Sequence, residues 1–438
     1  MAPPAKENDA QRLPEASNGQ DPEKPYLAVA DRSKPPQEAP DGGLTAWLVV
    51  LGSWCVLFCS FGWINSIGTF QEYYETDLLR EYSASTIAWI PSLQIFFMYA
   101  MSAVVGLLYD HFGPHWLLLV GSFLHVFGLM MASISTEYYQ ILLSQGVCSA
   151  IGVSIIFQPA ISVIPGWFHR KRGAAFGITT SGSSIGGVIL PIMMEKLITR
   201  AGFGWAMRSG AFLILGLLII GNLTIRSRQP PRPKSLSRDA LLQPFHEPKM
   251  MLVIVGFVLL TFGVFIPMDY LVVESLSNGM HPSLAQYMLP ILNAGSLFGR
   301  LSAGLFADRF GPYNIFILVC YLAGILILAL WIPATSTAAN IVFAILFGFS
   351  SGAYVALAAA LVVKISPFPQ IGYRIGLVFF FASFSGLTTN PIAGAILAQN
   401  HGSYTGMKVF AGVLLLAGTS LILVARIMQT GWTVLARF

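Results

Sequence analysis

Charge is what this sequence most lacks. Asp, Glu, Lys and Arg together make up 10% of its 438 residues, whereas hydrophobic residues make up 55%. Since soluble domains carry roughly a quarter charged residues, this composition excludes an ordinary soluble protein. With a mean hydropathy of +0.67, the sequence predicts an all-α membrane protein whose helices cross the bilayer many times.

Cysteine and clustered polar residues are also scarce. The four cysteines all fall inside apolar runs, which supports neither a disulfide framework nor a zinc site. His125 is the one histidine deep in an apolar run, and no group of His, Cys and acidic residues faces it. A polar pore or a selectivity-filter loop is also missing. We therefore expect neither an enzyme nor a channel, and no catalytic residue, metal or cofactor.

Apolar runs between charged or Pro/Gly breaks predict twelve membrane-spanning helices, six in each half of the chain. They are expected near residues 45–68, 85–108, 114–134, 138–164, 173–197, 205–225, 250–272, 283–306, 313–332, 338–364, 373–397 and 404–427. The predicted domains are a disordered tail (1–43), a six-helix bundle (44–225), a basic, proline-rich linker (226–249), a second six-helix bundle (250–427) and a tail (428–438).

The distribution of basic residues predicts the orientation. Most of the 25 Lys and Arg residues fall in the two tails, the linker and the loops on the same side as these. Both termini are therefore expected in the cytoplasm of a multi-pass protein of the cell membrane. Because this charge of +5 is spread over loops, nucleic acid is not an expected partner. No apolar run precedes residue 44, so no cleaved signal peptide is expected.

One motif is written twice. GLLYDHFGP (106–114) is repeated almost letter for letter as GLFADRFGP (304–312), and RKRGAAFGITTSGSSIGGVILP (170–191) is echoed by GYRIGLVFFFASFSGLTTNP (372–391). A similar offset, close to 200 residues, separates both pairs, which indicates duplication of a half-molecule. Gly173 and Gly177, four residues apart, allow close helix approach, either for static packing or for gating.

Three aspartates precede predicted helices. Asp41 comes before the first helix, and Asp110 and Asp308 come before the third and the ninth. A carboxylate is favoured at the positive end of a helix dipole, so each could cap the helix that follows it. The Gly-Pro pairs that begin at Gly113 and Gly311 predict tight turns into those helices.

Arg300 is the one basic residue well inside a predicted span. Burying an unpaired arginine at the membrane centre costs on the order of 2.5–3.5 kcal/mol, so a compensating group is expected. A substrate carboxylate fits best, because the guanidinium offers a planar bidentate fork. The alternative is a side chain that reaches the cytoplasmic interface and pairs with Asp308.

At the repeated GLxxDxFGP the sequence resembles the major facilitator superfamily. DGGLTAW (41–47) and WFHRKRGAAFGITTSGSSIG (167–186) resemble its monocarboxylate porter family, fungal branch. The resemblance covers residues 41–427 and implies two pseudo-symmetric six-helix bundles. It also implies that the repeated motif forms a conformational latch whose contacts break when the halves move. The latch residues would be Gly106, Asp110, Gly113, Gly304, Asp308, Arg309 and Gly311.

The resemblance also implies roles around Arg300. The family places a substrate-anchoring arginine on its eighth helix, eight residues before the loop acid, as Arg300 precedes Asp308. Two departures argue against proton-coupled symport of the lactate type: Asn65 stands where such porters have a lysine, and Ser296 where they have an aspartate. A co-transported proton stays open, because an acid substrate can bring its own.

Further polar residues fall on helices that line the cavity in this superfamily. Each either contacts a ligand or bonds a neighbouring helix. They are Asn65, Gln158, Asn293, Tyr354 and Asn390. Trp63 and the run 379–381 are expected to line a cavity for a bulky, partly apolar solute. Of the acidic residues, only Glu195 and Asp269 fall within predicted spans, both near their outer ends.

The predicted function is secondary transport of an organic anion or fungal secondary metabolite by alternating access, with export favoured. One alternative is uptake of a monocarboxylate or a vitamin such as riboflavin. Another is a non-transporting nutrient sensor. The expected partners are a small organic anion or partly apolar metabolite and the lipid bilayer, and the sequence leaves the oligomeric state open.

Overall fold

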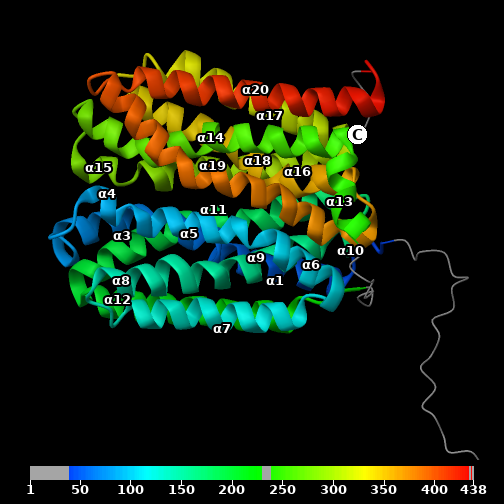
Figure 1. The fold of residues 1–438 in the computed structure, drawn as a ribbon, viewed down its shortest axis with the longest axis horizontal. Coiled ribbons are helices and arrows are strands. Elements are labelled where there is room, and N and C mark those ends of the chain that lie inside the picture. Colours follow the sequence, from blue (N-terminus) through cyan, green and yellow to red (C-terminus); the bar gives the residue numbers. More distant parts are fainter. Residues whose placement is uncertain (1–38, 229–237, 434–435, 437–438) are drawn as a thin grey trace, which may run out of the picture. The chain divides into compact units, whose positions relative to one another are not determined.

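The computed structural model describes residues 39–228, 238–433 and 436. Most of the predicted N-terminal tail lies outside these residues, as does part of the linker. Every regular element in the described ranges is a helix, which confirms the all-α prediction. Figure 1 shows two groups of helices, α1 to α12 and α14 to α20, which we name the first and the second helix group. The exact domain boundaries stay predictions.

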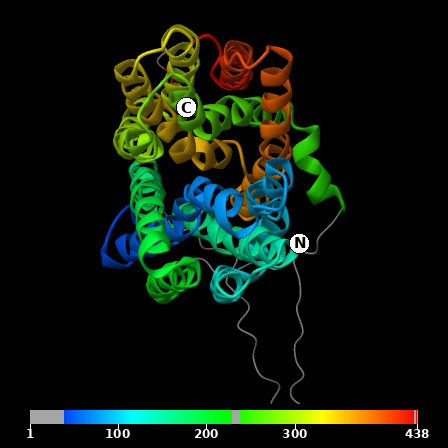
Figure 2. The same cartoon turned by 90° about the vertical axis from the view of Figure 1, so that its left-hand side faces the viewer.

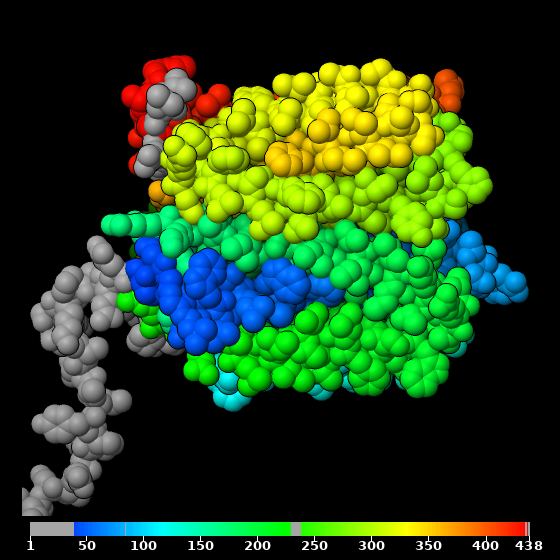
Figure 3. Space-filling view, turned by 180° about the vertical axis from the view of Figure 1, so that it is seen from behind, coloured from blue at the N-terminus to red at the C-terminus, as the bar shows by residue number. Residues whose placement is uncertain are grey.

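The first helix group follows the predicted order with more breaks than expected. Its elements are α1 Leu44–Cys59, α2 Phe61–Ile64, α3 Ile67–Tyr73, η1 Tyr74–Leu78, α4 Ala84–Ile87, α5 Trp89–Ala100, α6 Ser102–Phe112, α7 His115–Ala132, α8 Tyr138–Ile141, η2 Leu142–Ser149, α9 Ala150–Ser162, α10 Ile164–Trp167, α11 Arg172–Ala201 and α12 Phe203–Thr224. In Figure 3 the blue α1 is seen against the green of this group, and it packs on α11 and α12.

A helix inside the predicted linker, α13, precedes the second helix group. The elements are α13 Arg238–His246, α14 Pro248–Ser277, α15 Pro282–Ala285, α16 Met288–Phe310, α17 Pro312–Leu326, η3 Ile327–Trp331, α18 Thr337–Lys364, η4 Phe368–Gln370, α19 Ile371–Gln399 and α20 Thr405–Thr430. The predicted linker, residues 226–249, thus contains a short helix, α13. Pro248 starts α14, where its missing N–H costs nothing.

Eleven helical segments of the described residues are long and apolar enough to cross a membrane. The one predicted span missing from these eleven, residues 283–306, corresponds to α16, which has 23 residues. Its length suffices, but Arg300, Asp308 and Arg309 make it too polar to stand out by composition. Since α16 packs between α11 and α18, neighbouring helices rather than lipid cover its polar face.

The first predicted span is broken near its end. Ser60 interrupts the helix with φ −90° and ψ −83°, and its hydroxyl donates to the Val56 carbonyl at 2.8 Å. Such back-bonding competes with the helical ladder and bends it. Two short helices and a π turn then carry the chain to Leu78. As a result Asn65 lies on irregular backbone, where it can point between the two helix groups.

Candidate functional site

The first contact between the helix groups joins α16 to the start of α11. The Asp308 carboxylate accepts hydrogen bonds from the backbone N–H groups of Gly173 (2.6 Å) and Ala174 (2.9 Å). These N–H groups lack partners within their own helix, and the helix dipole favours an anion there. A Cβ atom added at Gly173 would lie 2.5 Å from the carbonyl oxygen of Gly304, so glycine is required for this approach. We name this contact the Asp308 crossing.

The repeat of the motif makes a matching contact between α6 and the start of α19. The Asp110 carboxylate accepts from the N–H groups of Gly372 (2.9 Å) and Tyr373 (2.8 Å). A Cβ atom added at Gly106 would lie 2.1 Å from the carbonyl oxygen of Gly372. We name this the Asp110 crossing, and the end of the molecule with both crossings the crossing end. Each repeated acid therefore caps a helix of the opposite group.

The alternative that these aspartates cap the helices that follow them does not describe this structure. Asp110 and Asp308 lie in the last turns of α6 and α16, and α7 and α17 begin beyond them. Gly113 (φ 77°) and Gly311 (φ 92°) make the turns in between, as expected for glycine. Arg309, the remaining predicted latch residue, is exposed with its guanidinium 5.6 Å from the Phe310 ring, and it makes no hydrogen bond or ion pair within the described ranges.

Asp41 also caps a helix other than the predicted one. Its Oδ1 accepts from the N–H groups of His169 (2.6 Å), Arg170 (2.7 Å) and Lys171 (3.2 Å), which lead into α11. Burial acts to raise the pKa of Asp41, but these three backbone hydrogen bonds outweigh it and leave the pKa below its usual value. The loop before α11 is therefore fixed by the first residues of the membrane domain.

The linker helix supports the Asp110 crossing. Glu247 and Arg374 form a bidentate ion pair with both N···O distances 2.6 Å, and the Tyr373 hydroxyl donates to the Leu241 carbonyl at 3.0 Å. The Arg374 side chain is fully buried. Its hydrogen bond and its charge hold the pKa of Glu247 below the usual value. Sequence reasoning missed this pair because Glu247 was placed in the linker and Arg374 at the very start of a predicted helix, far apart in the sequence.

Arg300 lies along the contact between α16 and α11, and it is 4% exposed. Its Nε donates to Ser296 Oγ (3.1 Å), and its Nη1 donates to the Thr180 carbonyl (2.7 Å) and to Ser183 Oγ. Within the described ranges no carboxylate forms an ion pair with it. The alternative of a side chain paired with Asp308 therefore does not describe this structure.

An aromatic cluster lies beside Arg300, between the two helix groups. It consists of Phe61, Tyr99, Phe157, Phe265 and Phe379. Tyr99 stacks on Phe379 across the two helix groups, with centroids 5.3 Å apart and planes at 1°. Tyr99 is also an electrostatic neighbour of Arg300. The cluster therefore separates the guanidinium from the cavity described next.

A cavity of about 640 Å³ opens between the helix groups at the end opposite the crossings, which we name the cavity end. Figure 2 views the molecule from this end, where α3, α4 and α15 lie. The cavity is lined by Ile64, Asn65, Ile67, Gly68, Gln71, Ser85, Ala88, Trp89, Pro91, Ser92, Ile95, Phe265, Met268, Asp269, Tyr270, Val273, Leu289, Leu387, Asn390, Pro391 and Gly394. Asp269 is the one charged residue among them.

The predicted substrate residues fall in different places. Asn65 and Asn390 line the cavity, and Asn293 donates to Asn65 Oδ1 at 3.3 Å across the two groups. Gln158 donates to the Gly372 carbonyl at 2.9 Å, so it belongs to the Asp110 crossing. Tyr354 lies inside the second group, 3.3 Å from Thr261 Oγ1. The structure brings Asn65, Asn293 and Asn390 to the cavity region and leaves the other two away from it.

The expectation that Trp63 and the Phe run line the cavity was wrong. Trp63 is fully buried against Phe70, with ring centroids 5.0 Å apart. Phe379 belongs to the aromatic cluster, and Phe380 and Phe381 lie on other contacts. The wall uses Trp89 and Phe265 instead.

A buried acid was also missed. Glu274 lies in α14, which runs beyond the predicted end at residue 272, and it pairs with Lys408 of α20. The Lys408 ammonium also donates to the Trp331 carbonyl at 2.7 Å and lies 5.0 Å from that indole ring. Arg300 is therefore not the sole buried basic residue, and Glu195 and Asp269 are not the sole acids within spans.

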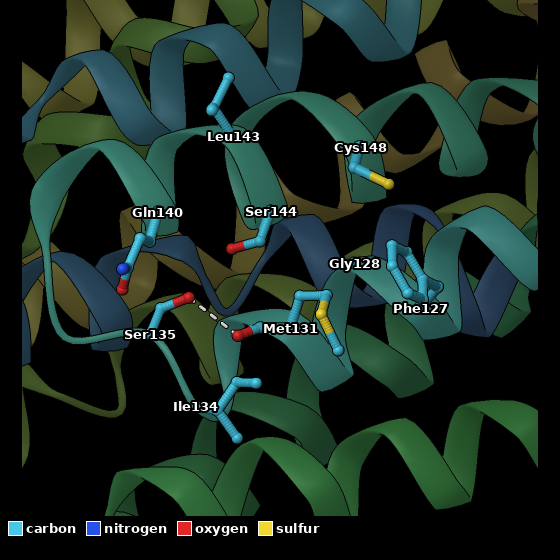
Figure 4. A pocket seen from close by; sticks show the side chains of 9 residues that line it. All are labelled: Phe127, Gly128, Met131, Ile134, Ser135, Gln140, Leu143, Ser144 and Cys148. Carbon is cyan, nitrogen blue, oxygen red and sulfur yellow. Dashed lines mark hydrogen bonds between the residues drawn. The ribbon is translucent and has the colours of Figure 1, made fainter.

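A second, smaller cavity lies on the outside of the first group. Figure 4 shows this space of about 390 Å³ between α7 and η2. Phe127, Ile134 and Leu143 on its wall are exposed, and the Ser135 hydroxyl is satisfied by the Met131 carbonyl at 2.8 Å. Its apolar, outward-facing wall is of the kind that lipid covers.

Comparisons with known proteins agree with this architecture. The family described as Major Facilitator Superfamily matches residues 49–340 and 275–432. The chain is 60% identical to "MFS transporter asaE" of Aspergillus flavus over 92% of this chain and 91% of that one. It is 50% identical to the "Fujikurins efflux protein" of Gibberella fujikuroi over 95% and 92%. The solved structure of FucP in the outward conformation superposes with a TM-score of 0.69 at 14% identity, over 86% of this chain and 98% of that one.

Proposed function

The chain belongs to the Major Facilitator Superfamily and is a multi-pass membrane transporter, not an enzyme, and from this premise we propose that it exports a small organic anion or fungal secondary metabolite by alternating access. The observation that carries the proposal is the asymmetry between the two ends. Both crossings close one end, and the 640 Å³ cavity opens at the other.

The way in which the crossings are built supports alternating access. Each consists of two hydrogen bonds from one carboxylate to helix N-terminal N–H groups, and of glycine backbones in direct contact. Such contacts exist only while the helices touch, so rocking the groups apart would break all of them together. The opposite state would have the crossing end open and the cavity end closed.

Export is supported by a similar protein rather than by the conformation of this structure. The basic loops and the linker lie at the crossing end, which the charge distribution predicts to be cytoplasmic. The cavity would then open to the outside, a state that importers and exporters both adopt during alternating access. A relative with 50% identity that carries the words "efflux protein" in its name supports export.

Arg300 is the proposed anchor for an acidic group of the cargo. Its partners are a carbonyl and two hydroxyl oxygens, so its positive charge has no formal counter-charge within hydrogen-bonding distance. In the opposite state the stack of Tyr99 on Phe379 would open and expose it. The narrower assignment to the monocarboxylate porters rests on the spacing of Arg300 and Asp308, and Ser296 and Asn65 depart from that pattern.

Metabolite profiling of a deletion strain tests the proposal. We expect at least one metabolite to be retained in the cells and depleted from the medium, and reintroduction of the wild-type gene to restore the ratio. Equal distribution in both strains would contradict export. Slower removal of a monocarboxylate or riboflavin from the medium would indicate uptake instead.

A further inference from the structure

The cavity wall contains one acidic residue, and this residue forms no ion pair in the described ranges. It is Asp269, the one ionisable acid or base among the lining residues apart from tyrosine, whereas the ion pairs of the described ranges join Glu247 to Arg374 and Glu274 to Lys408. A carboxylate removed from bulk water needs a compensating partner, because its desolvation is costly. Asp269 therefore resembles Arg300 in lacking a counter-charge, but it faces the open cavity.

Asn390 completes an acceptor pair beside Asp269. Its side-chain amide lies beside the Asp269 carboxylate, while its own Oδ1 is buried and has no hydrogen-bond partner. The Tyr270 hydroxyl donates to the main-chain carbonyl of Asn390 at 3.2 Å, which ties α14 to α19 at this height. The carboxylate and the free amide oxygen thus form two adjacent acceptors in a fixed arrangement.

Among the described residues, the groups around this pair supply no positive charge. The neighbouring titratable groups are Tyr270 on α14 and Tyr404 just before α20, which are neutral acids. The walls near the first helix group are apolar or carry neutral amides and hydroxyls, among them Trp89 and Gln71. A cationic partner for the ionised form of Asp269 would therefore come from the contents of the cavity.

We propose that Asp269 and Asn390 form a subsite for a hydrogen-bearing nitrogen of the transported molecule, an ammonium or amide N–H group. Such a group offers two or more donors, one for the carboxylate and one for the Asn390 Oδ1, and charge-assisted bonds of this kind are the strong ones. This proposal adds a substrate class to the proposed function. It rests on that function in one respect: the cavity is taken to be the path of transport. Together with Arg300, it selects molecules with an acidic and a nitrogenous part.

Direct binding to the purified full chain in lipid nanodiscs tests the subsite. The probe is 9-aminoacridine, a flat fluorescent amine, and its matched counterpart is acridine-9-carboxylate. Asp269→Asn, which keeps the shape and removes the charge, should weaken amine binding by about 10-fold or more, equivalent to about 1.4 kcal/mol. The carboxylate probe should bind the variant as well as the wild type or better. Glu195→Gln, a second acid within a span but outside the cavity lining, serves as the control and should leave both affinities unchanged.

Three results would overturn the subsite: equal amine affinity in the wild type and Asp269→Asn, no amine binding to the wild type, or equal losses for both probes. Should Asp269→Asn not fold, Asn390→Ala provides the same test, with a severalfold loss expected for the amine alone. Amine binding needs no transport cycle. It would therefore survive if profiling contradicted export, and it could fail while export held.

Discussion

The two crossings share a backbone design but continue into different surroundings. Beyond the Asp308 crossing, the contact of α11 with α16 stays polar: Arg300 bonds Thr180 and Ser183, and Ser184 donates to Ser296 at 3.2 Å. Beyond the Asp110 crossing, the contact of α5 and α6 with α19 turns apolar, with Tyr99 stacked on Phe379. The two halves therefore kept the same backbone contacts at the crossings and diverged along the path proposed for the cargo.

A second difference lies in what supports each crossing. The start of α19 is tied to the linker by the pair of Glu247 and Arg374, whereas the loop before α11 is held by Asp41. The linker joins the two helix groups, so the Asp110 crossing is coupled to the connection between the halves. Four predictions test these differences between the crossings.

The largest effect on transport is expected at Arg300, in the polar contact of α11 with α16. Arg300→Ala should lower transport of the retained metabolite by about 100-fold or more, equivalent to about 2.7 kcal/mol, because the anchor for its acidic group is lost. Arg300→Lys should rescue poorly, since an ammonium lacks the planar fork. Transport assays in vesicles at matched protein abundance measure this. Arg309→Ala, on the exposed side of the same helix, is the control. A wild-type transport rate in Arg300→Ala would mean that Arg300 does not bind the cargo.

The next effect is expected at the glycine contacts. Gly106→Leu and Gly304→Leu should each prevent closure of the crossing end, since an added Cβ would meet backbone at 2.1 Å and 2.5 Å. Spin labels at residues 112 and 369, in a cysteine-free background, should report longer distances in both variants. Gly216→Leu, with open space around it, should leave the distances unchanged. Unaltered distances in the first two variants would mean that the crossings do not determine closure.

A smaller, unequal effect is expected from the acids. Asp308→Ala should reduce turnover by about 10-fold, equivalent to about 1.4 kcal/mol, and Asp110→Ala by less, because the linker also holds α19. Adding Glu247→Gln to Asp110→Ala should bring its loss to that of Asp308→Ala. Vesicle transport rates for the three variants test whether the linker supports the Asp110 crossing. Equal losses in the two single variants would show that the linker gives no support.

The sequence predicted the crossings only in part. The duplicated motif shows in the letters, and the all-α fold follows from composition and apolar runs. The partner of Asp110, however, lies at Gly372, on a helix of the other group, and pairing across groups leaves no periodic signal along the chain. The apparent cap position before a Gly-Pro turn pointed to the wrong helix for this reason.

The acidic residues within the membrane spans were harder to predict from the sequence than the crossings. Glu274 was missed because α14 extends past the last strongly apolar run, and its burial depends on Lys408 from α20. Asp269 was recognised as lying near the outer end of a span, but its place on the cavity wall beside Asn390 is set by the packing of α14 on α19. Arg300 stood out because a single charge in an apolar run is visible in the sequence itself.

The smallest expected effect is on the acid stability of the linker contact. The pKa of Glu247 is lower in the folded protein than its ordinary value of 4.5, chiefly because Arg374 hydrogen-bonds its ionised form. The pair therefore stabilises the fold above that value, and this contribution is lost as the pH falls through the lowered pKa. The melting temperature should fall more steeply on acidification below about pH 4.5 in the wild type than in Glu247→Gln. The difference should be small, since Glu247 is 34% exposed and solvent screens the pair, and parallel melting curves would mean that the ion pair does not hold α19.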